Sequence, residues 1–280
     1  MSFITKISLS NFNKYAFFLH FISAVAITIV FFVKKGDINF NTDLYSYKIT
    51  DIEGERNEKI TFSFGEEGDP KIEVKSVALK IIVILIFAIT ALFHLLYWRS
   101  DFYKKEIEKG YNRYRWLEYS ITATLMIFII CIISGLKEYN TVFLICILNI
   151  SLMSLGYFLE RSPYLEVKIV CLVLGFFLLI SIFSFIYYSL ITNLKRTNDI
   201  GYDVPDWIQV VLIPMVLWWI SFGVVAILQT VNMNKKNYTF VTYEKWYIFL
   251  SYVSKAFMGY YLVFGLTRDK ADKKNASLTF

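Results

Sequence analysis

Seven apolar runs constrain the fold of this 280-residue chain more than any other feature of its sequence. A helix needs roughly 20 mostly apolar residues to cross the hydrocarbon core of a bilayer, and each run is about that long. Only 19% of the residues are charged, fewer than in most soluble domains, and they gather between the runs. We therefore predict an all-α membrane protein, a single seven-transmembrane-helix bundle over residues 1–280. The predicted helices are residues 15–33, 77–98, 116–136, 141–159, 169–191, 207–231 and 246–266.

The net charge of +6 does not indicate nucleic-acid binding. The basic residues cluster at the ends of the apolar runs, where membrane topology accounts for them. Cys131, Cys146 and Cys171 lie inside apolar runs and lack the spacing of metal ligands. We expect them to be small buried hydrophobic residues rather than disulfide partners, and we predict no metal site.

One connection is long: residues 36–76, between the first and second predicted helices. It is rich in acidic residues and shows strand-like alternation at residues 44–50 and 60–64, with a turn signal at residues 51–55. This pattern predicts a β-hairpin that lies on one face of the membrane. We expect a solvated cap rather than a catalytic domain, and we do not expect the protein to be an enzyme.

Lysine and arginine residues in short loops predict the orientation in the membrane, because they gather on the cytoplasmic side. The opposite short loops hold only Lys137, Lys195 and Arg196. We therefore predict a cytoplasmic N-terminus and an extracellular C-terminus. The basic residues on the N-terminal side are Arg99, Lys104, Lys105, Lys109, Arg113, Arg115, Arg161, Lys168, Lys235, Lys236 and Lys245.

Lys255 lies in the middle of the last apolar run, with no other charge nearby. A lone ammonium group at mid-bilayer costs about 3 kcal/mol on insertion scales, so such a lysine is by default a functional-site hypothesis. Two interpretations follow. Lys255 could pair with an intramembrane acid purely to hold helices together, or its amine could be modified covalently, for which a Schiff base is the best precedent. Glu118, early in the third run, is the available acid.

Further polar residues lie inside the predicted helices. His20 is early in the first helix and His94 is late in the second, so alternating helix direction places both in the same leaflet as Glu118. Ser251 precedes Lys255 by one turn and Thr122 follows Glu118 by one turn, which puts each pair on one helix face. We predict one polar cavity on the N-terminal side of Lys255. Counted from the tryptophans, Glu118 lies shallower than Lys255, so the third helix must extend past Arg115 or be staggered.

These residues resemble the heliorhodopsin family, a branch of the microbial rhodopsins, over the whole chain. The third helix opens with Arg-Trp-Leu-Glu-Tyr-Ser at residues 115–120, and the last helix carries Ser-Tyr-Val-Ser-Lys at residues 251–255. The two histidines, the sequence Val-Pro-Asp at residues 204–206 and the long loop after the first helix are also similar to this family.

The resemblance implies that Lys255 carries all-trans retinal as a protonated Schiff base, with Glu118 as its counterion. Thr122 and Ser251 would form hydrogen bonds near the Schiff base, and the two histidines would line a hydrated, proton-accepting cavity. The family places its N-terminus inside the cell, as the loop charges also predict. We further expect a homodimer and leave open an unidentified signalling partner.

A retinal pocket should be apolar and aromatic. The candidate pocket residues are Met126, Asn149, Met153, Phe176, Phe177, Pro214, Trp218 and Trp219. For any one of these residues, ordinary helix packing is the better explanation. Asn149 stands out slightly because it is polar at mid-membrane.

The sequence departs from that of pumping rhodopsins. Those proteins carry a second aspartate where this chain has Ser251, and proton pumps carry a donor carboxylate where this chain has the apolar residues 125–130. We therefore expect a light sensor or light-driven regulator and not a pump. Two alternatives stay open. One is a light-gated passive proton conductance, as reported for viral members of the family, which would use Glu138, Asp199 or Asp203 at the outer rim. The other is a seven-helix protein without a chromophore.

Overall fold

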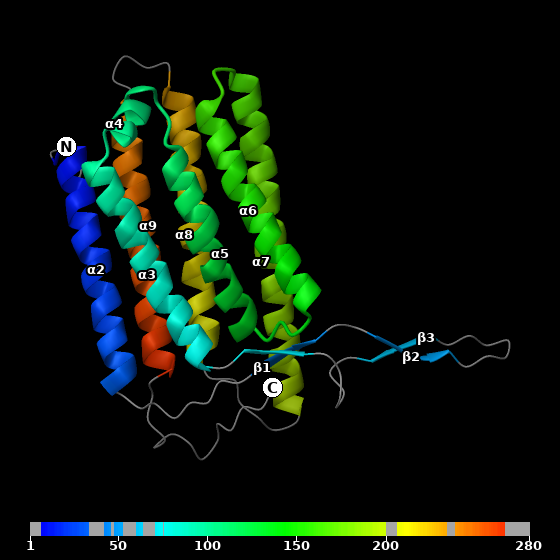
Figure 1. Ribbon diagram of the computed structural model, residues 1–280. Coiled ribbons are helices and arrows are strands. Elements are labelled where there is room, and N and C mark those ends of the chain that lie inside the picture. Colours follow the sequence, from blue (N-terminus) through cyan, green and yellow to red (C-terminus); the bar gives the residue numbers. More distant parts are fainter. Residues whose placement is uncertain are drawn as a thin grey trace.

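Seven long helices form the body of the molecule (Figure 1). The computed structural model describes residues 7–33, 42–45, 48–52, 60–63, 71–74, 76–199, 206–233 and 239–266. Within these residues, seven helices are long and apolar enough to cross a membrane, which confirms the seven-helix prediction and indicates an integral multi-pass membrane protein. They are α2 (Leu9–Val33), α3 (Ser76–Arg99), α5 (Arg113–Ile133), α6 (Tyr139–Arg161), α7 (Leu165–Asp199), α8 (Asp206–Asn232) and α9 (Phe240–Leu266).

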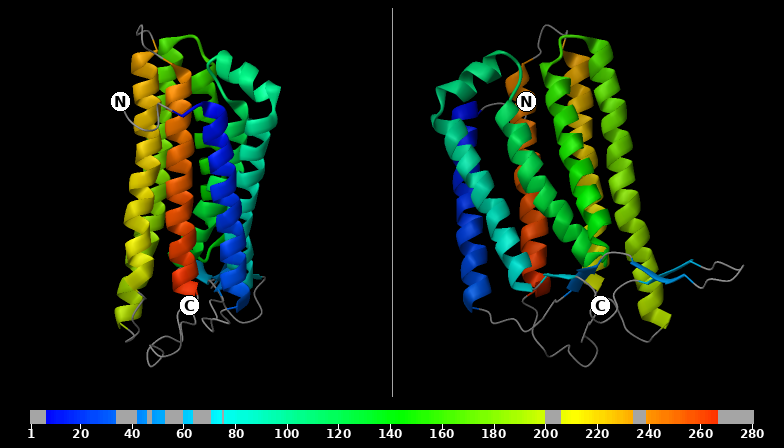
Figure 2. Two further views of the ribbon diagram at one scale, coloured as in Figure 1. Left: turned by 90° about the vertical axis from the view of Figure 1, so that its left-hand side faces the viewer. Right: turned by 45° about the vertical axis from the view of Figure 1, so that its right-hand side comes forward.

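The helices form a closed ring. Each long helix packs against the next one along the chain, and α9 packs against α2 to close the ring (Figure 2). The spans of α5 and α9 are the most enclosed, with 61% and 56% of their most apolar window buried, against 28% for α2, α6 and α7. The remaining surface of the outer helices is apolar and suits contact with lipid tails.

α5 begins at Arg113, three residues before the start predicted at residue 116. The prediction missed these residues because the first turn is charged and so does not belong to the apolar run. The Asn112 side chain caps this turn by accepting a hydrogen bond of 3.1 Å from the backbone nitrogen of Arg115. The helix therefore extends past Arg115. This is one of the two arrangements that the sequence analysis named for matching the depths of Glu118 and Lys255. Gly135, with φ of +80°, follows the other end of α5 in a conformation that favours glycine.

A short helix that the sequence analysis missed, α4 (Asp101–Glu108), lies across the N-terminal end of the bundle (Figure 1). Ser100 caps it, and its buried side is formed by Tyr103, Glu106 and Ile107. It is too short and too polar to show as an apolar run, so hydropathy alone does not detect it.

Four short strands lie between α2 and α3. β1 (Thr42–Tyr45) pairs antiparallel with β4 (Lys71–Val74), and β2 (Lys48–Ile52) pairs antiparallel with β3 (Ile60–Ser63). Leu44 and Val74 are buried in the core of the bundle. The predicted β-hairpin stays a prediction, because residues 53–59, which would form its turn, lie outside the described residues.

Candidate functional site

A buried ion pair between α9 and α5 forms the centre of the site. Lys255 Nζ donates to Glu118 Oε1 at 2.8 Å and to Ser251 Oγ at 2.7 Å. The lysine side chain is 3% exposed and the glutamate side chain 1%. Because removing one partner of a buried pair leaves an uncompensated charge, these two residues depend on each other.

Two threonines hold the Glu118 carboxylate. Thr90 Oγ1, on α3, donates to Glu118 Oε1 at 2.9 Å. Thr122 Oγ1 lies 3.4 Å from the same oxygen and also donates to the Glu118 backbone carbonyl at 3.0 Å. The sequence analysis did not single out Thr90. Thr90 could have been found from its position one turn before His94, which places both residues on one face of α3.

The two histidines lie together on the N-terminal side of Thr90. The rings of His20 and His94 are stacked, with centroids 5.6 Å apart. Among the described residues, neither ring nitrogen of His20 nor Nε2 of His94 has a hydrogen-bond partner, although both side chains are buried. Buried polar atoms of this kind are where proteins hold internal water, in keeping with the hydrated cavity that the resemblance implies.

A chain of hydrogen bonds leads from His94 toward the N-terminal face. His94 Nδ1 lies 2.9 Å from Asn13 Oδ1, and Asn13 Nδ2 donates to the Tyr103 hydroxyl at 3.1 Å. Tyr103 in turn donates to Glu244 Oε1 at 3.2 Å. Burial raises the pKa of Tyr103, so its hydroxyl stays protonated and remains a donor. Hydrogen bonds thus connect His94 to Glu244 near that end of the molecule.

Arg115 closes this chain between two buried carboxylates. Its guanidinium pairs with Glu160 on α6 and with Glu244 on α9, and it lies over the Tyr247 ring at 4.0 Å. The sequence analysis treated Arg115 as a loop charge that marks topology. That interpretation is wrong, since Arg115 is 1% exposed and its charge is neutralised inside the protein. The sequence feature that could have indicated this role is the presence of two acids, Glu160 and Glu244, at the ends of two apolar runs.

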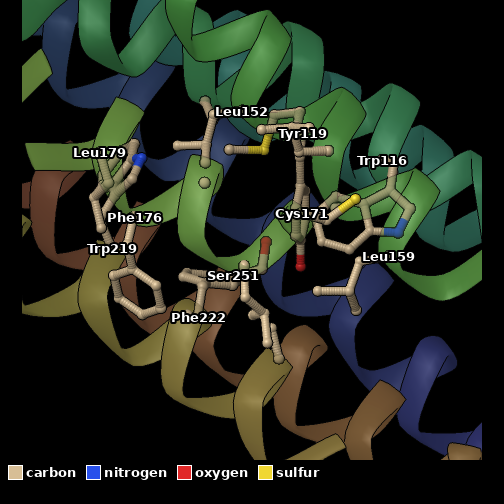
Figure 3. A pocket seen from close by; sticks show the side chains of 18 of the residues that line it. Trp116, Tyr119, Leu152, Leu159, Cys171, Phe176, Leu179, Trp219, Phe222 and Ser251 are labelled. Atoms are coloured by element: carbon tan, nitrogen blue, oxygen red, sulfur yellow. The ribbon is translucent and has the colours of Figure 1, made fainter. Parts of the chain in front are cut away.

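An apolar cavity with an empty volume of about 830 Å³, including its opening, adjoins the ion pair between α5, α6, α7, α8 and α9. Figure 3 shows aromatic and aliphatic side chains pointing into this space from the surrounding helices. Polar groups in the lining include those of Lys255, Ser251 and Ser254 on α9. Residues in the lining include Trp116, Tyr119, Met126, Met153, Gly156, Cys171, Phe176, Leu179, Trp219, Phe222 and Gly223.

Two helical glycines in the lining make room for aromatic rings. A Cβ at Gly156 would lie 2.2 Å from the ring of Trp116, and a Cβ at Gly223 would lie 2.6 Å from that of Phe176. Both rings line the cavity. The cavity therefore has the character of a site for a long apolar ligand held at one point by an amine.

The structure separates the candidate pocket residues into two groups. Met126, Met153, Phe176 and Trp219 line the cavity, whereas Phe177 is 67% exposed on the outside of the bundle. Neighbouring residues on a helix point about 100° apart, so Trp219 and Trp218 cannot face the same space.

Three other candidates lie away from the lining. Trp218 packs beside the cluster that contains Tyr247 and Leu250. Asn149 donates to Thr124 Oγ1 at 2.9 Å. Pro214 lies inside α8, more than one turn before Trp219.

Comparison with known proteins gives one family and one fold. The sequence model of the family described as Heliorhodopsin matches residues 9–267. The light-driven proton pump LR (Mac) from Leptosphaeria maculans has a similar structure, with a TM-score of 0.60 at 12% identity over 92% of this chain and 95% of that one. Exiguobacterium sibiricum rhodopsin gives a TM-score of 0.57 at 14% identity, over 92% and 97%. At these identities the two structures show the fold alone. The search of curated proteins gives no match.

Replacing Arg115 tests the buried charge network. Arg115→Gln should lower the free energy of unfolding by about 3–5 kcal/mol, because Glu160 and Glu244 lose the cation that they share. Arg113→Gln is the matched control. Its side chain is 56% exposed, so its pair with Glu106 should contribute only about 0–1 kcal/mol. Equilibrium unfolding of the retinal-free protein in detergent measures both values, and equal losses would contradict the network.

Proposed function

The chain belongs to the heliorhodopsin family, and on this premise we propose that it is a light-absorbing photoreceptor with a signalling or regulatory role. In this proposal all-trans retinal is bound covalently to Lys255 as a protonated Schiff base, with Glu118 as its counterion. One observation carries the proposal: the buried contact between Lys255 and Glu118 opens directly on the apolar cavity. We propose no enzymatic activity.

The residues present fit this chromophore. A polyene needs an apolar cavity with an amine at one end, and Lys255 is in the lining of such a cavity. Met126, Phe176 and Trp219 would hold the polyene by apolar contact. Retinal, when bound, supplies visible absorption and light-driven isomerisation.

Glu118 would hold the positive charge at Lys255 Nζ. In a medium of low dielectric constant, a carboxylate 2.8 Å from this nitrogen stabilises the cation strongly. Thr90 keeps the carboxylate in place from α3, and Ser251 offers the amine a second oxygen. The energy of this pair would therefore govern both the charge at Lys255 and the absorption of a bound chromophore.

The stacked histidines are the best candidates to accept a proton from this region. Imidazole takes up protons near neutral pH in water, and three of the four ring nitrogens here have no hydrogen-bond partner among the described residues. They lie on the N-terminal side, where the chain through Asn13 and Tyr103 begins. A proton that moves to these histidines and returns crosses no membrane, which suits a sensor.

The opposite half of the bundle supports the absence of pumping. Ser251 stands where pumps carry a second acid, and Ile127, Ile129 and Ile130 are completely buried beyond the ion pair. Among the described residues, the single buried carboxylate toward that end is Glu138. It caps α6 by accepting a hydrogen bond of 3.0 Å from the backbone nitrogen of Asn140. Asp203 and the side chain of Asp199, the other rim acids of the conductance hypothesis, lie outside what the structure describes.

Orientation and assembly complete the proposal. We propose a cytoplasmic N-terminus, because Arg99, Lys104, Lys105 and Lys109 lie at that end of the bundle and the short loop after α5 holds only Lys137. We also propose that the protein forms a homodimer and that the strands between α2 and α3 belong to a capping β-hairpin on the extracellular face.

Removing the lysine should remove the chromophore. Lys255→Ala should fold but show no visible absorption band after addition of all-trans retinal. Lys245→Ala, which changes the other lysine of α9, should keep the band. Absorption spectra with and without hydroxylamine under light provide the measurement. A visible band in Lys255→Ala would refute the covalent site.

Removing the acid should change the colour. Glu118→Gln should shift the visible band to longer wavelength, or convert it to a near-ultraviolet band at neutral pH, because the cation loses its nearest carboxylate. Glu160→Gln should change the spectrum little, since Glu160 pairs with Arg115 and not with Lys255. An unchanged spectrum in Glu118→Gln would mean that another acid is the counterion.

Illuminated cells in unbuffered medium should show no sustained pH change, because the single buried carboxylate in the extracellular half of the described bundle, Glu138, caps α6. Any photocurrent under voltage clamp should reverse near the proton equilibrium potential. Lys255→Ala, which should bind no chromophore, is the control. Such a passive current would favour the conductance hypothesis. A steady uphill proton flux at zero voltage and equal pH would overturn the non-pumping proposal.

A further inference from the structure

A second cavity opens on the N-terminal face, where α4, the start of α5 and the end of α6 meet. Its empty volume is about 720 Å³, including the solvent at its mouth. We call it the basic pocket. Its lining consists of Phe102, Lys105, Glu106, Lys109, Tyr111, Arg113, Tyr157 and Arg161. None of these residues lines the apolar cavity beside Lys255.

The basic pocket has an excess of positive charge. Its four cations face a single acid, Glu106, which is already engaged: Arg113 Nε lies 2.6 Å from Glu106 Oε1. No ion pair joins Lys105, Lys109 or Arg161 to a carboxylate among the described residues. These three cations repel one another in the absence of an anion, so an anion bound between them relieves that repulsion.

Lys104 shows that this excess belongs to the pocket and not to α4 as a whole. It follows Tyr103 on the same helix, but its Nζ forms an ion pair of 2.8 Å with Asp101. The hydrogen bond and the charge of Lys104 lower the pKa of Asp101. The neighbouring Lys105 points to the pocket, with its Nζ 5.9 Å from the centroid of the Phe102 ring.

The depth of the pocket indicates where the anion comes from. Arg113 is the first residue of one membrane span and Arg161 the last residue of the next, so the pocket lies at the level where lipid headgroups begin. Its rim is apolar as well as basic, because Phe102 is 68% exposed. Basic pockets at the ends of transmembrane helices on the cytoplasmic side bind phosphate-bearing headgroups.

We propose that the basic pocket binds the phosphate group of an anionic membrane lipid. Arg161 offers a planar fork of N–H donors that matches phosphate oxygens, and the tyrosine ring of Tyr111 orients it from 4.6 Å. Lys105 and Lys109 add mobile positive charges around the same space. This site rests on the proposed cytoplasmic N-terminus but not on retinal, so it stands or falls separately from the proposed photoreceptor function.

Native mass spectrometry of the full chain with equimolar phosphatidylglycerol and phosphatidylcholine tests the proposal. The wild type should retain phosphatidylglycerol selectively, and Lys109→Gln/Arg161→Gln should reduce that retention by about thirtyfold, given the contribution of each of the two basic residues near an anionic surface. Lys14→Gln/Lys104→Gln, which removes the same charge from the same face outside the pocket, should retain the lipid. Lys105→Gln/Lys109→Gln provides the same test if the arginine variant does not fold.

A second arm distinguishes the lipid from a soluble phosphate. In neutral detergent without lipid, millimolar inorganic phosphate should leave the melting temperature of the wild type unchanged if the lipid supplies the phosphate. A rise that the pocket variants abolish would support phosphate recognition but assign it to a soluble anion. Equal lipid retention by the wild type and both pocket variants, with no response to phosphate, would overturn the proposal.

Discussion

The buried contact between Lys255 and Glu118 is the interaction on which the rest of the structure depends. Taking two charges out of water costs several kcal/mol for each ion, and only close pairing with further hydrogen bonds offsets that cost. Thr90 and Ser251 supply those bonds from α3 and α9. The two helices that carry the charges, α5 and α9, are also the most enclosed spans, so the outer helices shield the pair from lipid.

Polar groups are distributed unevenly along the bundle. From the ion pair toward the N-terminal face they continue through the histidines and Tyr103 to Arg115 with its two acids. Toward the other face, the described part of α5 presents closely packed isoleucines. A bundle of this kind can move a proton within one half more easily than across the membrane. This asymmetry, more than any single residue, supports the proposed role as a sensor.

The first turn of α5 serves two different environments. Arg113 lies in the basic pocket at the surface, whereas Arg115, two residues later, points into the protein. Two residues correspond to about 200° of rotation on a helix, so these side chains must face nearly opposite directions. Asn112, as the cap, sets the start of the helix and thereby the orientation of both arginines.

The sequence by itself determined the seven helices and drew attention to Lys255, Glu118 and the two histidines. It could do so because polar groups at mid-membrane are costly and therefore conspicuous against an apolar background. Only the tertiary structure decided that Thr90 reaches Glu118, that Arg115 is shared by two acids, and that Trp219 rather than Trp218 faces the cavity. These outcomes depend on the rotation and relative depth of neighbouring helices. Hydropathy gives the length of a span but carries no information on how far it is turned or shifted against the next one.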